Sequence, residues 1–290
     1  MTSDSPAVPS AWWATPRIRL VLRLAMLVGL GLGIETAVLH LLMDPLADVH
    51  AYYDAGARLN AGQPLYDQPA GVDEAAFYRY PPLLAILFRP LALFPFAVAA
   101  TIWMAAIALM LAATLIRIDI RRPIPLFVVC ALALPIGWSV VIGQAQVAVT
   151  LLLALGAPWS VALATNLKLF PVLVAVWWLG RRRWRALGEL LVWLVVLGAV
   201  QLVLEPAGTL AYPSVLRLDQ VGNVVSLSPY AVAPWLWAVL VVVGVALALW
   251  AAPRRWGWAA AVALSVLTSP RLLLYQISSL VAATREPEER

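Results

Sequence analysis

Long apolar runs alternate with short polar stretches from one end of this chain to the other. Runs near or above 18 residues are long enough for a helix across about 30 Å of hydrocarbon. The pattern predicts membrane helices over residues 18–43, 96–116, 123–141, 186–204 and 231–251. The alternation typical of membrane strands is absent. The sequence therefore indicates an all-α fold, a polytopic transmembrane helix bundle whose first run is retained as a signal anchor.

Two shorter apolar segments, residues 145–157 and 158–180, lie between arginine clusters that we expect on the same side of the membrane. An even number of crossings must then separate the clusters. We therefore expect a descent over the first segment and a re-entrant hairpin over the second, with its apex near residues 166–171. Broken backbone at membrane depth is tolerated where it lines a cavity. Lys168 at this apex would meet an anion there, unless it snorkels from a helix end.

The remaining segments complete the predicted organisation. Residues 83–94 read as an interfacial or half-membrane helix, and residues 256–267 and 272–283 are apolar but short, which leaves their depth open. The predicted domain boundaries are a disordered cytoplasmic tail over 1–16, one transmembrane domain over 17–284 and a charged tail over 285–290.

Composition and charge agree with a multi-pass membrane protein. Of 290 residues, 63% are hydrophobic and only 12% charged, which is too little polar surface to coat a soluble globule. The basic residues form clusters between apolar runs, so the pI of about 9.7 marks topology rather than nucleic-acid binding. The clusters are Arg17/Arg19/Arg23, Arg117/Arg121/Arg122, Arg181/Arg182/Arg183/Arg185 and Arg254/Arg255. Under the positive-inside rule all four face the cytoplasm.

This topology places the longest polar passage, residues 44–82, outside the cell. It holds six carboxylates (Asp44, Asp48, Asp54, Asp67, Asp73, Glu74), Arg58, Arg79 and five tyrosines (Tyr52, Tyr53, Tyr66, Tyr78, Tyr80). Its helical spacing over 46–60 predicts an interfacial helix, with Asp48 and Tyr52 on one face and His50 and Asp54 on another. The second external loop, 205–229, contains Arg217 and Asp219.

The candidate chemistry is narrow. Two histidines and one cysteine are scattered, which gives no metal-ligand cluster. The chain has neither a glycine-rich phosphate loop followed by Lys-Ser/Thr nor a Gly-x-Ser-x-Gly motif. What remains is the external carboxylate set together with isolated cations, Lys168 and Arg271, beside helix breaks. A base near one end of a site and cations near the other suit displacement of a phosphate leaving group.

Four motifs in order carry a family resemblance. They are the external-loop pattern over residues 48–56, 62–67 and 77–82, then Gly143-Gln144, then residues 167–171 followed by 181–185, and finally Ser269-Pro270. Together they resemble glycosyltransferase family 87, the polyprenyl-phosphate-sugar-dependent transferases of the GT-C class. The resemblance covers most of the chain from residue 45 onward. The chain differs from the family at Arg271 and Tyr275, where histidines are frequent.

The resemblance implies a GT-C-like membrane enzyme with a mannosyl or arabinofuranosyl donor on a polyprenyl phosphate. Transfer would occur on the outer side of the cytoplasmic membrane, to a glycolipid or glycan acceptor, and direct displacement would invert the anomeric centre. By motif match the catalytic base is Asp48. We expect Lys168 and Arg271 to hold the phosphate. We expect the sugar or acceptor pocket to be lined by Tyr52, Tyr53 and Gln144.

No cofactor is expected, because the lipid-linked sugar is a substrate, and the sequence leaves a metal requirement open. The expected partners are the donor, the acceptor and the lipid bilayer, without nucleic acid. Two other functions stay open. One is a lipid-linked sugar flippase in which Glu35, His40 and Lys168 act as midplane coupling groups. The other is a noncatalytic partner of a larger transferase, because members of the family are usually longer. Asp44 is the competing candidate for the base.

Overall fold

The computed structural model describes residues 16–67, 77–215 and 226–287, and these residues are helical with no strand among them. Its four longest helices are α1 (Pro16–Met43), α4 (Phe96–Arg117), α10 (Trp184–Leu204) and α12 (Pro234–Ala251). Each is long and apolar enough to cross a membrane. The predicted all-α transmembrane bundle is thus confirmed. Residues 1–15, 288–290, Asp73, Glu74, Arg217 and Asp219 of the predicted tails and loops lie outside the described residues.

The predicted span over 123–141 is apolar and long enough to cross a membrane, but it is bent. The chain forms two helices there, α5 (Pro123–Ala131) and α6 (Ala133–Val141), which meet at an angle of 62°. Pro135 explains the break, because proline has no N–H to donate to the carbonyl four residues earlier and its ring crowds that carbonyl.

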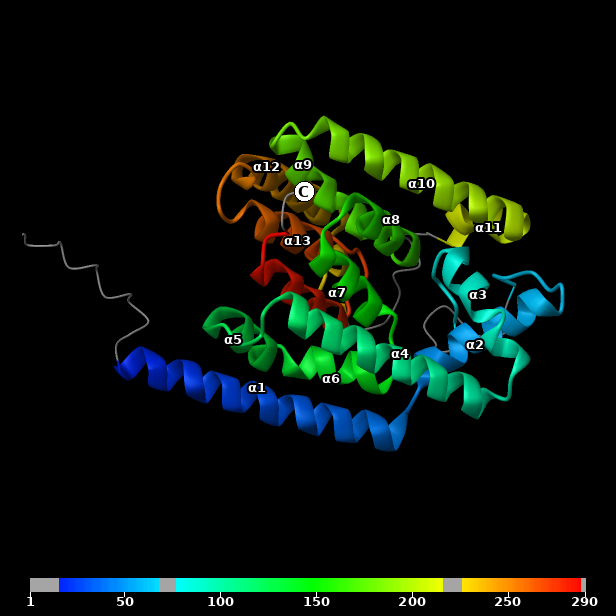
Figure 1. Cartoon of the computed structure of the whole chain (residues 1–290), viewed down its shortest axis with the longest axis horizontal. Coiled ribbons are helices and arrows are strands. Elements are labelled where there is room, and N and C mark those ends of the chain that lie inside the picture. The colour runs from blue at the N-terminus through cyan, green and yellow to red at the C-terminus, as the bar shows by residue number, and fades with distance from the viewer. Residues whose placement is uncertain (1–15, 68–76, 216–225, 288–290) are drawn as a thin grey trace, which may run out of the picture.

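Short helices fill the interior of the molecule. They are α7 (Gln146–Leu155), α8 (Pro158–Leu167), the 3₁₀ helix η3 (Phe170–Val174), α9 (Ala175–Gly180), α13 (Gly257–Leu267) and the 3₁₀ helix η6 (Leu274–Thr284). A ten-residue helix is only about 15 Å long, so neither α7 nor α8 crosses a bilayer alone. Figure 1 shows α7 and α13 between α1 on one side and α10 on the other. Nearly every residue of α7 is buried, whereas α1 buries two glycines.

The long helices enclose the short ones and face outward. Their outer surfaces carry large exposed apolar side chains such as Leu109, Val203 and Val242, which hydrocarbon accommodates and water does not. Helix α1 packs on α5 and α6 through Gly29 and Gly33. A Cβ on Gly29 would lie 2.2 Å from the carbonyl oxygen of Cys130, so only glycine permits this close helix contact.

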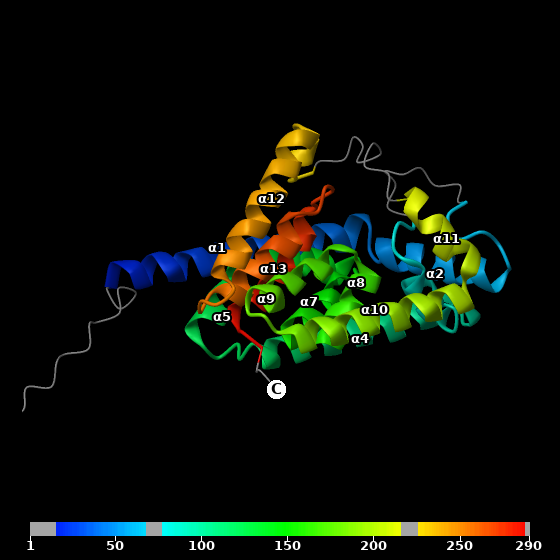
Figure 2. The ribbon, with the colours of Figure 1, turned by 90° about the horizontal axis from the view of Figure 1, so that it is seen from above.

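The elements of the two loops that were predicted to be external gather at one end of the bundle. They are α2 (Ala47–Asn60), α3 (Pro82–Phe88), the 3₁₀ helix η2 (Leu91–Leu93) and α11 (Pro206–Val215). Figures 1 and 2 both place α2 and α11 at this end, on the right of each view. The helix predicted over 46–60 is confirmed as α2. The sequence did not predict α11.

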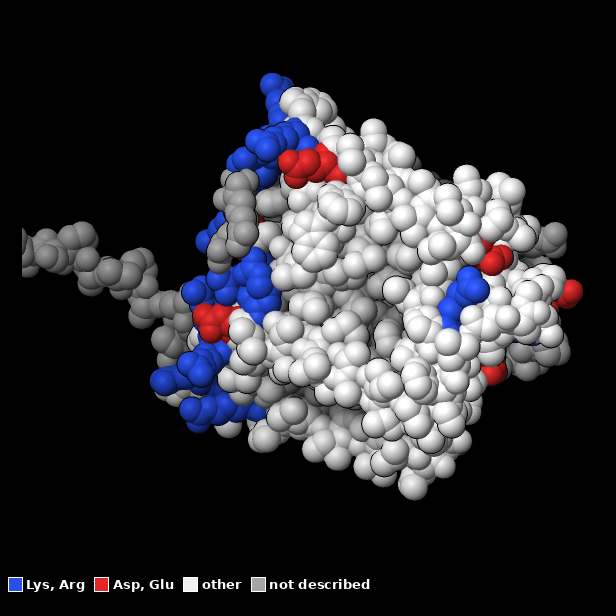
Figure 3. Space-filling model, turned by 45° about the vertical axis from the view of Figure 1, so that its right-hand side comes forward, with Lys and Arg blue, Asp and Glu red and all other residues white. Residues whose placement is uncertain are grey.

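The two ends of the molecule differ in charge. Lys and Arg side chains gather along one edge of the face in Figure 3, and a broad uncharged surface follows before a few charged residues at the far end. The turns that carry the arginine clusters, between α4 and α5, α9 and α10, and α12 and α13, lie at the end opposite α2 and α11 in Figure 1. An uncharged band between two charged ends is what a bilayer requires.

This charge asymmetry predicts the side of the membrane that each end faces. With Cys130 replaced by alanine, a single cysteine at the exposed Gln63 should react with a membrane-impermeant thiol reagent in intact cells. A cysteine at the exposed Arg183 should react only after the cells are opened. The reverse pattern would contradict the orientation.

Candidate active site beside helix α2

The N-terminus of α2 is fixed on the C-terminus of α6. The backbone N–H groups of Leu46 and Asp48 donate to the carbonyls of Val141 and Ile142 at 3.2 and 3.1 Å. The first N–H groups and last carbonyls of a helix have no partner within the helix, so these two helix ends satisfy each other. Asp48 is thereby held beside the turn that joins α6 to α7.

Gly143 makes this turn and permits the contact. Its φ of 71° lies in the left-handed region, and a Cβ there would stand 2.1 Å from the Val49 Cγ2 atom. Its carbonyl accepts a hydrogen bond of 2.8 Å from the Trp103 indole of α4. The turn places the next residue, Gln144, in the interior, where it is fully buried.

Gln144 and two tyrosines surround the Asp48 carboxylate. The Gln144 Oε1 atom accepts hydrogen bonds from the hydroxyls of Tyr52 at 2.7 Å and Tyr80 at 3.0 Å. The same hydroxyls lie 3.4 and 3.3 Å from Asp48 Oδ1. A phenol has one proton to donate, and the shorter distances assign both protons to Gln144. Asp48 therefore receives only long, weak contacts and retains lone pairs for another donor.

Burial raises the pKa of the Asp48 carboxyl from 3.8 to about 6. The positive charge of Lys168, the weak contact with the Tyr80 hydroxyl and the charge of Arg79 act in the opposite direction. Loss of hydration outweighs these attractions. A carboxylate with this pKa is ionised at pH 7 and accepts a proton more readily than an ordinary aspartate.

Lys168 enters the same site from the break between α8 and η3. Its Nζ atom donates to Gln146 Oε1 at 2.7 Å and lies 5.4 and 4.8 Å from the ring centroids of Tyr80 and Tyr275. The lysine therefore points into the bundle rather than toward the membrane interface. The predicted break near residues 166–171 is confirmed.

A buried chain of polar groups orients the partner of Lys168. Gln146 Nε2 donates to Ser279 Oγ at 2.6 Å, and Thr150 Oγ1 lies 2.7 Å from the same oxygen. With its amide nitrogen engaged in this way, Gln146 turns its oxygen toward Lys168. The sequence analysis did not identify Gln146, Thr150 or Ser279, since nothing in their local sequence shows that α7 and η6 pack together.

Tyr80 is positioned by the segment that leads into α3. The Tyr66 hydroxyl donates to the Tyr80 carbonyl at 2.8 Å. The Tyr78 hydroxyl donates to the Pro81 carbonyl at 2.7 Å and accepts from the Ala85 amide at 2.9 Å. These bonds tie the start of α3 to the residues before it. Tyr80 was seen in the sequence only as part of the external-loop motif.

Arg271 and Tyr53 occupy different positions relative to this cluster. Arg271 follows α13 and is partly buried, and its charge acts on Tyr275, whose ring contacts Lys168. Tyr53 donates to the Phe94 carbonyl at 2.8 Å and packs edge-on against Phe96. The structure thus brings together four of the predicted site residues, Asp48, Tyr52, Gln144 and Lys168, with Arg271 one contact further away and Tyr53 on another face of α2.

The ionisable groups that a flippase would use do not lie together, and the competing base Asp44 lies outside the cluster around Asp48. His40 Nδ1 lies 2.6 Å from Asp44 Oδ1, so the competing carboxylate Asp44 pairs with α1 instead of joining Gln144. Glu35 is exposed on α1 and Lys168 lies inside the bundle. Glu35, His40 and Lys168 therefore do not form the set of neighbouring midplane groups that a flippase would require. Within the described ranges no group of three or more His, Cys, Asp or Glu side chains could hold a metal ion.

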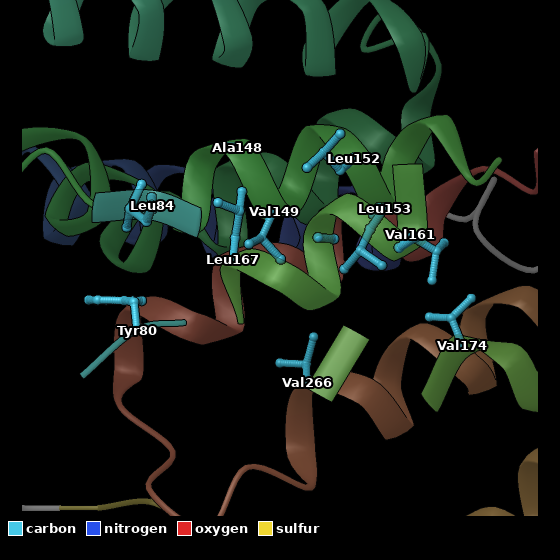
Figure 4. Close-up of a cluster of buried hydrophobic side chains, with 14 of the residues drawn as sticks. Tyr80, Leu84, Ala148, Val149, Leu152, Leu153, Val161, Leu167, Val174 and Val266 are labelled. Atoms are coloured by element: carbon cyan, nitrogen blue, oxygen red, sulfur yellow. The ribbon is translucent and has the colours of Figure 1, made fainter. Parts of the chain in front are cut away.

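The site lies at one end of the apolar core. Leu84, Val149 and Val161 are fully buried in this core, and Tyr80 belongs to the same cluster (Figure 4). Such surroundings exclude water and lower the local dielectric constant, which strengthens every charge interaction inside the site.

These features define a multi-pass membrane protein with a partly buried site of acid, amide and ammonium groups at the end of the bundle that carries α2 and α11. The family model for glycosyltransferase family 87 matches residues 77–275, and the chain belongs to this family. It is therefore a membrane glycosyltransferase. Comparisons with curated proteins and with solved structures gave no match. The matched region includes Tyr80, Gln144 and Lys168, whereas Asp48 and Tyr52 precede it, so their assignment to the site rests on geometry.

The Gly143 turn can be tested by adding one methyl group. Gly143→Ala combines a left-handed backbone, which costs roughly 1–2 kcal/mol for other residues, with the contact at Val49. We expect a lower thermal stability in detergent and at least about ten-fold slower sugar transfer, because α2 must move. Gly198→Ala in α10, where a Cβ meets nothing within 4 Å, is the matched control and should retain both. Normal activity of Gly143→Ala would show that this turn does not position Asp48.

Proposed function

We propose that this glycosyltransferase moves a sugar, mannose in the first instance, from a polyprenyl phosphate to a hydroxyl group of an external glycolipid or glycan. The enzyme would work at the outer face of the cytoplasmic membrane. The observation that carries the proposal is the partly buried carboxylate of Asp48, with a pKa of about 6, in the same electrostatic site as Lys168. A base beside a cation suits attack by a hydroxyl group on a carbon that bears a phosphate.

In the proposed reaction Asp48 accepts the proton of the acceptor hydroxyl as its oxygen attacks the anomeric carbon of the donor. The bond from that carbon to the phosphate oxygen breaks, and its electron pair leaves with the polyprenyl phosphate. Attack from the side opposite the leaving group inverts the anomeric centre. The departing phosphate is stable as an anion, so one carboxylate suffices and no partner acid is required.

Lys168 and Arg271 are proposed to hold the donor phosphate. Lys168 is oriented by Gln146 at 2.7 Å, and a charge-assisted hydrogen bond is about twice as strong as a neutral one. The developing charge on the phosphate would be met by a cation already in place. Such preorganisation in a water-excluded site lowers the barrier without rearrangement at the moment of reaction.

Gln144 is proposed to contact the sugar or the acceptor. Its Nε2 atom is buried and has no hydrogen-bond partner among the described residues, while its Oε1 accepts from Tyr52 and Tyr80. An unsatisfied buried donor costs about 1–3 kcal/mol. A hydroxyl group of a bound substrate would supply the missing acceptor, so this amide favours a ligand rich in hydroxyl groups.

The base is tested by removing its charge. Asp48→Asn keeps the size of the side chain but cannot accept the proton, so turnover should fall by at least about 10²-fold with donor binding nearly intact. Asp54→Asn, on the exposed face of α2, is the matched control, and Asp44→Asn tests the competing carboxylate. Both should transfer sugar at near-normal rates. Near-normal transfer by Asp48→Asn would remove this residue from the mechanism.

The pKa of Asp48 sets the pH dependence of transfer. Below about pH 6 the carboxyl is protonated and cannot accept the acceptor proton, so kcat/KM should fall roughly ten-fold per pH unit as the pH decreases below 6. A pH profile of the wild-type protein, measured from about pH 4.5 to about pH 8 in steps of about half a pH unit, checks this pH dependence. The residual activity of Asp48→Asn should lack the inflection, and an inflection that persisted would belong to another group.

The cation site is tested through donor affinity. Lys168→Met removes a charge-assisted contact worth about 1.5–3 kcal/mol, so binding of a polyprenyl-phosphate sugar should weaken about ten- to a hundred-fold. Arg271→Gln should act in the same direction. Arg254→Gln, at an exposed turn, is the control for overall charge. Unchanged donor affinity in both site variants would disprove the phosphate contact.

A further inference from the structure

The outward face of α1 carries a carboxylate at membrane depth. Glu35 is exposed, and it forms no hydrogen bond or ion pair with the residues that the structure describes. Arg23 and Asp44 bracket the apolar part of this helix and are separated by about 31 Å at 1.5 Å per residue. Glu35 then lies about 13 Å from the outer boundary, near the middle of the bilayer. Its side chain is too short to reach water from there.

Glu35 belongs to a regular seam of exposed positions, which we call the α1 seam. Its members are Leu24, Val28, Gly31, Glu35, Val38 and Leu42. They follow one another at alternating steps of four and three residues, which is the spacing of a helix that packs against another helix. The four apolar members are 49–77% exposed. The seam lies on the side of α1 opposite Gly29 and Gly33, which pack on α5 and α6.

At Gly31 the backbone of another helix can approach the backbone of α1 closely. A Cβ at this position would meet nothing within 4 Å, so the space beside Gly31 is open in the single chain. Small residues allow the backbones of two membrane helices to come close, and a polar group at such an interface then bonds across it. Gly31 and Glu35 are one helical turn apart, which places the carboxylate next to the closest contact.

We propose that the α1 seam docks a transmembrane helix of another protein, which places a Lys, Arg or His side chain opposite Glu35. Lipid tails cannot satisfy a carboxylate. A symmetric second copy would set Glu35 against Glu35. The other outward helices, α4, α10 and α12, offer no basic residue within their described lengths except near one end. Charge complementarity therefore selects a different protein, independently of the transferase function.

The test uses the full chain in phosphatidylcholine vesicles, with a fluorophore on a cysteine at Gln63 and Cys130 replaced by alanine. Three labelled peptides serve as probes: a leucine-rich helix of about 20 residues with one central lysine, the same helix with leucine there, and the α1 sequence itself. Energy transfer measures their association. We expect the lysine peptide to bind about ten-fold more tightly than the leucine peptide. Glu35→Leu should abolish the difference.

A matched variant separates position from charge. The double substitution Ile34→Glu with Glu35→Ile keeps composition and depth but turns the carboxylate by about 100° from the seam. It should lose the preference for the lysine peptide, and sugar transfer should stay at the wild-type level. Equal binding of the lysine and leucine peptides, a preference that survives the exchange, or tighter binding of the α1 peptide than of the lysine peptide would each overturn the proposal, the last in favour of a second copy.

Discussion

The contact between the N-terminus of α2 and the C-terminus of α6 determines where the Asp48 carboxylate lies. Two helix ends that each lack partners inside their own helix satisfy one another through Leu46 and Asp48. The contact needs a residue without a side chain at Gly143, and it leaves Gln144 facing the carboxylate. Helix α2 and the bent pair of α5 and α6 are thereby joined where acid, phenols and amide meet. The rest of the site is assembled around this joint.

Two opposing electrostatic effects meet at Asp48. Loss of water raises its pKa, while Lys168 and Arg79 stabilise its anion. If the attraction of the cations were the larger effect, the pKa of the carboxyl would be low, and the carboxylate would be a weak base held in an ion pair. Because Lys168 donates instead to Gln146, the acid and the cation share a site without a direct bond between them. The base thus lacks strong partners, and the cation is already oriented, as the proposed transfer requires.

Much of the fold, and part of the site, could be predicted from the sequence. The spacing of Asp48 and Tyr52 is a local property, because residues four apart share a helix face, and Lys168 stands out as a lone charge in an apolar run. Tyr53 follows Tyr52 by one residue, and the turn of about 100° carries it to Phe94 instead. The partners that come from distant segments, Gln146 and Ser279, depend on how α7 and η6 pack. No local pattern contains that information.

Hydrogen bonds of one side chain, Gln201, connect the candidate site to a helix whose outer surface is apolar. Gln201 of α10 accepts from the Leu83 amide at the start of α3 at 3.0 Å and donates to Asn166 at 2.6 Å. The outer side of α10 is apolar and exposed, so the thickness of the surrounding bilayer acts directly on its tilt. A change in tilt would move the segment that bears Tyr80 and the break that bears Lys168 together. Through Gln201, hydrophobic mismatch would then reach the candidate site, and membranes of different lipid chain length would be different environments for it.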